Sequence, residues 1–174
     1  MGDRDSERDA GFAEFVRGAH ASLLRTAVLL TGDRHAAEDL LQAALVRVYV
    51  RWNRSAGWES PQAYARKVVV NLFATWRRRR WNSEVPSGAE HHVTDAGDMA
   101  DGAARRLLVG RVLAALPRAQ RAVVVLRFYE DLSVEQTAEL LGCSPGTVKS
   151  RTNRALERLR ASGALAEYAG RSAR

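Results

Sequence analysis

The sequence has a single cysteine and no long apolar run. Because Cys143 has no second cysteine to pair with, an intramolecular disulfide and a cysteine-rich zinc site are both excluded. The longest apolar runs, such as Ala27–Leu30 and Ala122–Leu126, are far too short to cross a bilayer. The first ten residues are acidic and polar and lack the apolar stretch of a signal peptide. These absences predict a cytoplasmic protein with no membrane partner.

The charge balance is strongly basic. A net charge of +7 and a pI of about 10.4 favour a polyanionic partner, but net charge alone does not distinguish DNA from RNA or anionic lipid. Hydrophobic residues make up 46 % of the chain and charged residues 27 %, which is typical of a globular protein with a core. With 174 residues the chain has room for one ordinary domain or two small ones.

The periodicity of apolar residues is helical, and alternating strand patterns are absent. In the first half we expect helices over residues 11–30, 34–52 and 60–80. Asp33 suits the N-cap of the second helix, and Ser60 followed by Pro61 is typical of a helix start. Residues 83–103 contain glycines, a proline and five acidic residues without any Lys or Arg, which predicts a flexible linker. A surface loop within one domain is less favoured, because so long a structureless segment is unusual.

The resulting fold class is all-α, with small helical domains over residues 11–82 and 104–162. In the second domain one helix ends near Pro117, and others are expected over residues 118–129, 134–141 and 145–161. Ser133 and Gln136 form an S-x-x-Q capping box that marks the start of the helix over 134–141.

Residues 134–154 predict a helix-turn-helix. Such a motif needs a small residue where its helices touch, a turn residue that tolerates positive φ and a branched apolar residue that locks the second helix; Ala138, Gly142 and Val148 match these needs. The second helix carries five basic residues against one acid, as suits a helix in the major groove. An ordinary hairpin with a solvated basic face is the alternative. Because cap, turn, lock and charge coincide, DNA binding is favoured.

The helix from Tyr64 to Trp81 has six basic residues, no acid and four aromatic residues. Positive charge beside aromatic surface suits single-stranded or melting nucleic acid. For Phe73 and Trp76 a place in the core is the simpler interpretation, and the arginines that follow also favour the C-terminal dipole of their own helix. Asn71 stands among apolar residues, so it is either an exposed helical position or an amide that reads a base edge.

Three segments, in this order, resemble the extracytoplasmic-function (ECF) sigma factors of the sigma-70 family. Ala36–Ala43 is similar to the helix that docks on the polymerase β′ clamp, and Tyr64–Asn71, with the arginines after it, to the helix that reads the −10 element. Leu116–Arg121, continuing through Ser133–Ala138 to Gly146–Arg151, resembles the domain that reads the −35 element. The resemblance therefore implies a sigma-2-like and a sigma-4-like domain in a factor that directs core RNA polymerase to promoters.

The resemblance also implies which residues make the contacts. The β′ clamp would be contacted by Asp39, Leu40 and Gln42, and the β flap would be a second polymerase contact. The −10 element would be bound by Asn71, Tyr64, Lys67, Arg77, Arg78 and Trp58. Asn71 would receive a flipped base, and Trp58 would wall its pocket. The −35 duplex would be bound by Thr147, Lys149, Ser150, Arg151, Asn153 and Arg154. The acidic linker would pass through the RNA exit channel, where a basic surface is expected.

Two other classes of function are weighed against this one. A stand-alone helix-turn-helix transcriptional regulator would use the second domain alone, but the first domain has a basic, aromatic helix of its own. A metal enzyme would have to use His91 and His92 with Asp95 and Asp98, which lie in the linker without a rigid scaffold. No nucleophile–base arrangement stands out, so we expect no enzyme activity, no cofactor and no metal site. Whether an anti-sigma factor is a further partner is left open by the sequence.

Overall fold

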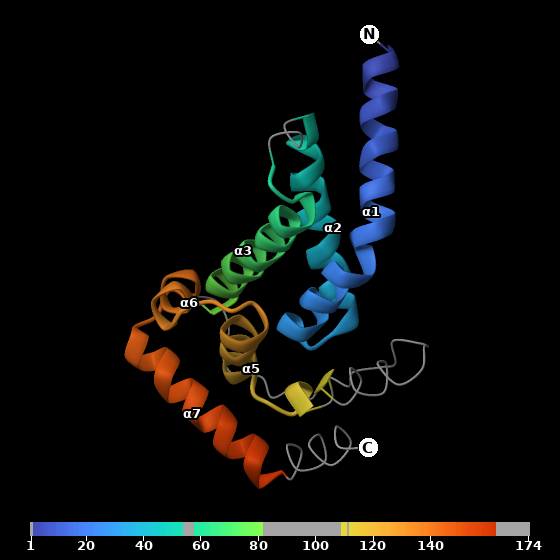
Figure 1. Cartoon of the computed structure of the whole chain (residues 1–174). Helices are drawn as coiled ribbons and strands as arrows, with labels where there is room; N and C mark the ends of the chain where they lie inside the picture. The colour runs from blue at the N-terminus through green and yellow to red at the C-terminus, as the bar shows by residue number, and fades with distance from the viewer. Residues whose placement is uncertain (1, 54–57, 82–108, 111, 163–174) are drawn as a thin grey trace.

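The computed structural model describes residues 2–53, 58–81, 109–110 and 112–162, with the backbone alone for residues 2–5 and 78–81. Within these ranges the regular elements are helices and no strand occurs, which confirms the predicted fold class. Helices α1, α2 and α3 form a first unit, and α5, the π-helical turn η2, α6 and α7 form a second (Figure 1). Their bounds are Gly2–Thr31 (α1), Arg34–Val50 (α2), Pro61–Trp81 (α3), Arg118–Val124 (α5), Val125–Tyr129 (η2), Val134–Leu141 (α6) and Pro145–Ala161 (α7).

The three helices of the first unit pack against one another around buried leucines. Leu23 and Leu30 of α1, Leu41 of α2 and Leu72 of α3 are almost completely removed from solvent, at positions that the helical periodicity marks as apolar. A chain of aromatic contacts with ring centroids 4.1–6.1 Å apart joins the helices elsewhere. Its members are Phe12, Phe15, Tyr49, Trp52, Trp58 and Tyr64.

Helix α1 begins much earlier than the periodicity predicts, because it extends to Gly2 instead of starting at Gly11 (Figure 1). Residues 2–10 lack an apolar stripe, so their sequence pattern does not mark a helix. Tertiary contacts hold this part against α2: Tyr49 donates a hydrogen bond of 2.7 Å from its hydroxyl to Asp9, and Arg8 donates one of 2.5 Å to the same hydroxyl. The hydrogen bond from Tyr49 also lowers the pKa of Asp9.

The expected helix starts are confirmed by their capping hydrogen bonds. The Asp33 carboxylate accepts from the amide of Ala36 at 2.8 Å, and the Ser60 hydroxyl accepts from the amide of Ala63 at 3.2 Å. Each cap pairs one of the amides that the first turn of a helix leaves without a partner. The caps therefore determine where α2 and α3 begin.

The prediction of a single α-helix over residues 118–129 is wrong for its last part. There the helix widens into the π-helical turn η2. The amide of Glu130 donates to the carbonyl of Val125 at 3.0 Å, and the amide of Leu132 donates to that of Leu126 at 3.0 Å. The wider turn keeps Val125 and Leu126 in the core, while Phe128 is left 60 % exposed. The propensities of the individual residues do not distinguish this turn from an α-helix.

The two units also contact each other. Helix α5 packs against α1, and α6 packs against α3, so segments far apart in the sequence lie side by side (Figure 1). The described helices include none that combines the length and the apolarity needed to cross a membrane.

Two valines on α2 test this account of the core. Val48 is 0 % exposed and Val46 is 63 % exposed. We expect Val48→Ala to lower the free energy of unfolding by about 2 kcal/mol, because it removes buried methyl groups and leaves a cavity. The matched control Val46→Ala should change it by less than about 0.5 kcal/mol. Urea unfolding followed by circular dichroism measures both, and equal losses would contradict the orientation of α2.

Candidate nucleic-acid interface

The helix-turn-helix forms as the sequence predicts. Ser133 and Gln136 make both hydrogen bonds of the capping box, at 3.0 and 2.8 Å. Gly142 ends α6 in the left-handed conformation with φ 63°, where a side chain would be strained. Ala138 and Val148 are buried in the core, so the small residue and the branched lock occupy the positions that the motif requires.

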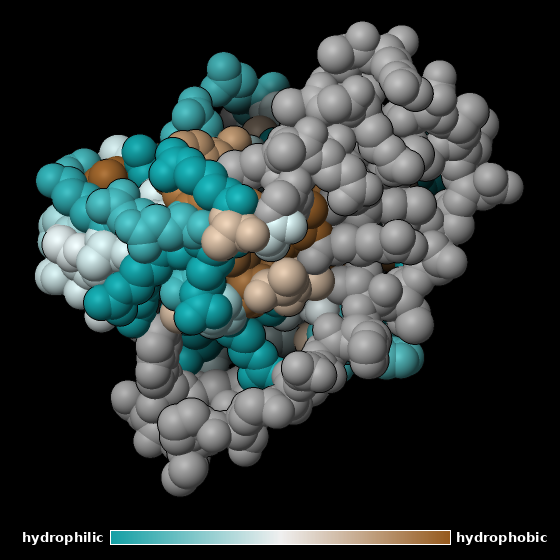
Figure 2. All heavy atoms as spheres, turned by 90° about the horizontal axis from the view of Figure 1, so that it is seen from below, coloured by the Kyte–Doolittle hydropathy of each residue, from teal (hydrophilic) through white to brown (hydrophobic). Residues whose placement is uncertain are grey.

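Helix α7 has one buried face and one basic outer face. Its start is capped by Ser144, whose hydroxyl accepts from the amide of Thr147 at 3.1 Å and lies 2.9 Å from the Thr147 hydroxyl. The face opposite the core is exposed, and the described residues on the side of α7 are mostly hydrophilic (Figure 2). The expected −35 residues that are exposed are Lys149, Ser150, Asn153 and Arg154. Thr147 and Arg151 are half-buried.

On α3 the spacing of Tyr64, Lys67 and Asn71 places these residues along one side of the helix. Lys67 and Asn71 are exposed. The Asn71 side chain has no hydrogen-bond partner among the described residues, and its backbone carbonyl accepts from the Thr75 hydroxyl at 2.9 Å. The amide of Asn71 is therefore available to a ligand.

Trp58 and Tyr64 are held together at the start of α3. Their rings stack with centroids 4.1 Å apart, and Arg51 donates a 3.0 Å hydrogen bond to the Tyr64 hydroxyl. Asn71 lies seven residues beyond Tyr64, which is about 10 Å along a helix. The structure thus places the Trp58–Tyr64 stack at the start of α3, and Trp58 is not among the residues that line the hollow beside Asn71.

Arg77 occupies a different place from the one expected. Arg77 follows Asn71 by six residues, so at 3.6 residues per turn the two side chains project from different sides of α3. Its side chain is half-buried, and burial together with the nearby Arg151 guanidinium lowers its pKa to about 10. In this arrangement Arg77 faces the second unit and is not part of the face that carries Asn71. The side chain of Arg78 lies outside the described residues.

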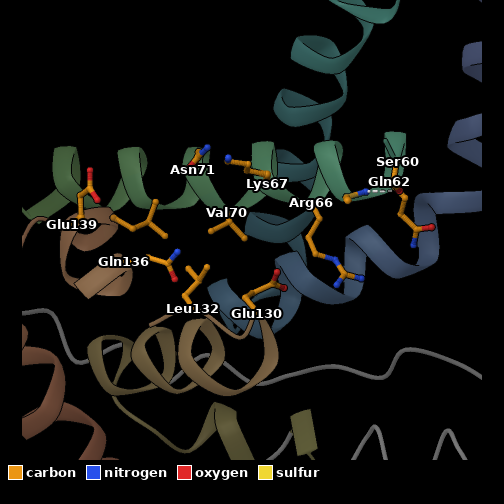
Figure 3. A pocket seen from close by; sticks show the side chains of 12 residues that line it. Ser60, Gln62, Arg66, Lys67, Val70, Asn71, Glu130, Leu132, Gln136 and Glu139 are labelled. Carbon is orange, nitrogen blue, oxygen red and sulfur yellow. Dashed lines mark hydrogen bonds between the residues drawn. The ribbon is translucent and has the colours of Figure 1, made fainter. Parts of the chain in front are cut away.

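A hollow with an open volume of about 890 Å³ lies between α3 and the second unit. Arg66 and Val70 project into it from α3, and Glu130, Leu132 and Gln136 face them from the second unit (Figure 3). Lys67 and Asn71 line it as well. The expected −10 face therefore borders the junction between the units.

On α2 the exposed face is a stripe along the helix axis. Asp39 and Gln42 are exposed, and neighbouring Glu38 is engaged by Arg34, which donates at 2.9 Å. Leu40 must be corrected: it is 0 % exposed and belongs to the core, so it cannot contact a partner. The pattern of the sequence could have shown this, because Leu40 lies on the apolar stripe of its own helix.

The same stripe contains two residues that sequence reasoning missed. Val46 and Val50 continue it from Asp39 and Gln42 at steps of three and four residues, and Val50 is 75 % exposed. Exposed valines signal a binding surface only when the buried face of the helix is known. Without the packing of α2 they count as ordinary apolar residues of an amphipathic helix.

No group of His, Cys, Asp or Glu within the described ranges is arranged to hold a metal ion. The alternative metal site at His91, His92, Asp95 and Asp98 lies outside those ranges.

Two helical units, one with a basic helix-turn-helix and the other with a helix that exposes Lys67 and Asn71, are typical of a DNA-binding transcription factor. Comparison with known proteins agrees: residues 15–83 match the model of Sigma-70 region 2, and residues 106–159 match that of Sigma-70, region 4. The RNA polymerase sigma-E factor of Streptomyces avermitilis is 45 % identical over 151 residues, which cover 86 % of this chain and 83 % of that protein.

The ECF RNA polymerase sigma factor SigL of Mycobacterium tuberculosis is 34 % identical over 157 residues, covering 87 % of this chain and 89 % of that protein. Among solved structures, the sigma factor RpoE of Bartonella quintana, crystallised with the anti-sigma factor NepR, is 26 % identical with a TM-score of 0.48, covering 86 % of this chain and 94 % of that chain. The chain belongs to the ECF group of the sigma-70 family. It is therefore a promoter-specific initiation factor that binds core RNA polymerase and promoter DNA, and it is not an enzyme.

Two glycines test the geometry of the helix-turn-helix. We expect Gly142→Ala to lower the free energy of unfolding by about 1–2 kcal/mol, because alanine is strained at positive φ. Gly18→Ala is the matched control, since Gly18 is exposed within α1 and a Cβ there would meet nothing within 4 Å. It should raise the free energy of unfolding by about 0.5–1 kcal/mol, because alanine is the better helix former. Urea titrations that shift both variants in the same direction would contradict this assignment.

Proposed function

We propose that this sigma factor reads two promoter elements with two exposed helix faces, the basic face of α7 on the −35 duplex and the Lys67–Asn71 side of α3 on the melted −10 element. The observation that carries the proposal is the placement of these faces on two small helical units that match separate regions of the sigma-70 family. Each unit alone would bind DNA weakly and mainly through phosphates. On core polymerase both are presented to one DNA molecule, so their affinities combine through effective concentration.

The proposed −35 contacts come from the outer face of α7. Lys149 and Arg154 supply long basic side chains for phosphates and guanine edges, and Asn153 supplies an amide that suits adenine. The hydroxyls of Thr147 and Ser150 are already engaged within the helix, at Ser144 and at the Thr147 carbonyl. We therefore assign base reading mainly to Asn153 and Arg154, with Lys149 positioning the duplex.

The proposed −10 contacts come from the side of α3 that carries Lys67 and Asn71. An amide without a protein partner can form hydrogen bonds with the edge of an unpaired base, and the neighbouring lysine neutralises a phosphate. Extruding a base from the duplex costs on the order of a few kcal/mol, which these contacts would offset. The Trp58–Tyr64 stack offers an aromatic surface on which a further base of the same unpaired DNA strand can stack.

The proposed polymerase surface is the outward stripe of α2. Asp39 offers a carboxylate that no described basic residue pairs with, and Gln42 offers an amide. Val46 and Val50 extend this stripe with apolar area, at steps of three and four residues that suit packing against another helix. We assign the stripe to the β′ clamp. The exposed Phe128 on the second unit is the corresponding apolar surface for the β flap.

The proposed domain boundaries are residues 11–82 and 104–162, joined by the acidic linker 83–103. The matched ranges 15–83 and 106–159 support them. The linker lies outside the described residues, and its passage through the RNA exit channel rests on charge complementarity alone. A factor that binds core polymerase and promoter DNA acts where the chromosome is, so we propose a cytoplasmic location.

Asp39→Arg tests the clamp assignment. Reversing this charge should weaken binding to core polymerase about tenfold or more, since it places like charges across the proposed interface. Glu14→Arg is the control, because Glu14 is exposed on α1 and away from the stripe. Fluorescence anisotropy of the labelled protein titrated with core polymerase gives both affinities. Unchanged binding by Asp39→Arg would remove α2 from the interface.

Arg154→Ala tests the −35 assignment in transcription. With core polymerase and a promoter library randomised at the −35 element, the variant should lose about 1–3 kcal/mol of discrimination at one position. Arg160→Ala removes the same charge from an exposed position elsewhere on α7 and should preserve the preference. If Arg154→Ala and the unaltered protein select the same −35 sequences, α7 does not read that element through this residue.

A further inference from the structure

The two units are joined by a buried arginine. Arg121 of α5 is only 6 % exposed, and its Nη2 donates a hydrogen bond of 2.5 Å to the carbonyl of Thr31, the last residue of α1. The guanidinium lies directly against Gly32, where a Cβ would overlap it. Gly32 also has φ +70°. Thr31 and Gly32 thus form a socket. Because Gly32 has no side chain, an arginine from the other unit fits there.

The chemistry of the socket explains why an arginine occupies it. The last carbonyls of an α-helix have no partner within the helix and form the negative end of its dipole. A guanidinium placed there donates a hydrogen bond to a carbonyl and is attracted by the negative end of the helix dipole. Within the described ranges no carboxylate pairs with it, and burial together with the nearby Arg118 lowers the pKa of Arg121 to about 10. The contact is therefore specific in geometry but modest in net strength.

Away from the socket, the junction combines packed helices with an open hollow. The hollow between α3 and the second unit leaves Arg66 and Glu130 facing each other, but Nε of Arg66 and Oε1 of Glu130 are buried without a hydrogen-bond partner among the described residues (Figure 3). Nearby, Arg77 of α3 and Arg151 of α7 are close enough for their like charges to repel. Unsatisfied polar atoms and like charges both disfavour burial. The Arg121 contact thus adds one geometrically specific anchor to a junction in which Arg66 and Glu130 attract each other while Arg77 and Arg151 repel.

This arrangement is incompatible with reading two promoter elements at once. The elements lie about 10 and 35 base pairs upstream of the start, so at 3.4 Å per base pair they are tens of ångströms apart. In the structure α3 packs against α6, and α6 packs against α7 in the helix-turn-helix, so the two proposed reading helices are held one helix apart. The units must separate before both elements can be bound, an argument that rests on the proposed roles of α3 and α7.

We propose that insertion of Arg121 into the Thr31–Gly32 socket is a latch that holds the free protein closed and that engagement of polymerase must release. A closed state lowers the apparent affinity for polymerase in proportion to the fraction of open molecules. The latch also sets a threshold for opening. A polyanion bound at Arg77 and Arg151 relieves their repulsion but does not by itself remove Arg121 from the socket.

Arg121→Gln in the full-length protein tests the latch, with Arg118→Gln as the matched control. Arg118 is exposed on the same helix, so its replacement removes the same charge without touching the socket. Small-angle X-ray scattering should give a larger radius of gyration for Arg121→Gln only. The native Cys143 is a second reporter, because it is half-buried close to Arg77 of the other unit. Its alkylation should become severalfold faster in Arg121→Gln and stay unchanged in Arg118→Gln.

Circular dichroism verifies that each variant keeps its helices. Gly32→Ala fills the socket from the first unit and should open the protein in the same way, so the test survives if Arg121→Gln fails to fold. A folded variant with an unchanged radius and alkylation rate would overturn the latch. Both readouts use the protein alone and do not depend on the assigned DNA contacts. Opening without tighter binding to core polymerase would overturn the inhibitory role.

Discussion

The packing of α1, α2 and α3 around shared leucines decides which face of each helix remains for a partner. A helix has one stripe to bury, and the residues opposite that stripe are left in solvent. On α2 the outward residues are Asp39 and Gln42, and on α3 they are Lys67 and Asn71. The proposed contact surfaces of the first unit therefore follow from its core. A change that rotated one helix would alter stability and partner binding together.

The second unit applies the same constraint on a smaller scale. Its helix-turn-helix has a short first helix, so the capping box at Ser133 and the left-handed Gly142 carry much of the geometry. These local devices orient α7 so that Val148 is buried and Arg154 is exposed. The π-helical turn before α6 has a comparable effect, because its extra width changes which residues face outward. Phe128 becomes surface while Leu126 stays in the core.

Basic charge has a cost in this protein as well as a use. Arginines that suit a polyanion repel one another when the units pack together, and Arg77 and Arg151 illustrate this at the junction. The Arg121 contact with the end of α1 offsets part of that repulsion through a helix dipole instead of an acidic side chain. A junction of this kind can be stable in the free protein and still yield to a partner that binds both units.

Local chemistry was enough to predict much of this molecule: the all-α fold class, the caps at Asp33, Ser60 and Ser133, and the helix-turn-helix around Gly142. Those features depend on neighbours within a few residues, so the sequence by itself determined them. The start of α1, the burial of Leu40, the direction of Arg77 and the socket for Arg121 depend on residues distant in the chain. Only the tertiary structure decided them, because which side of a helix is covered, and by what, is a property of the packed helices together.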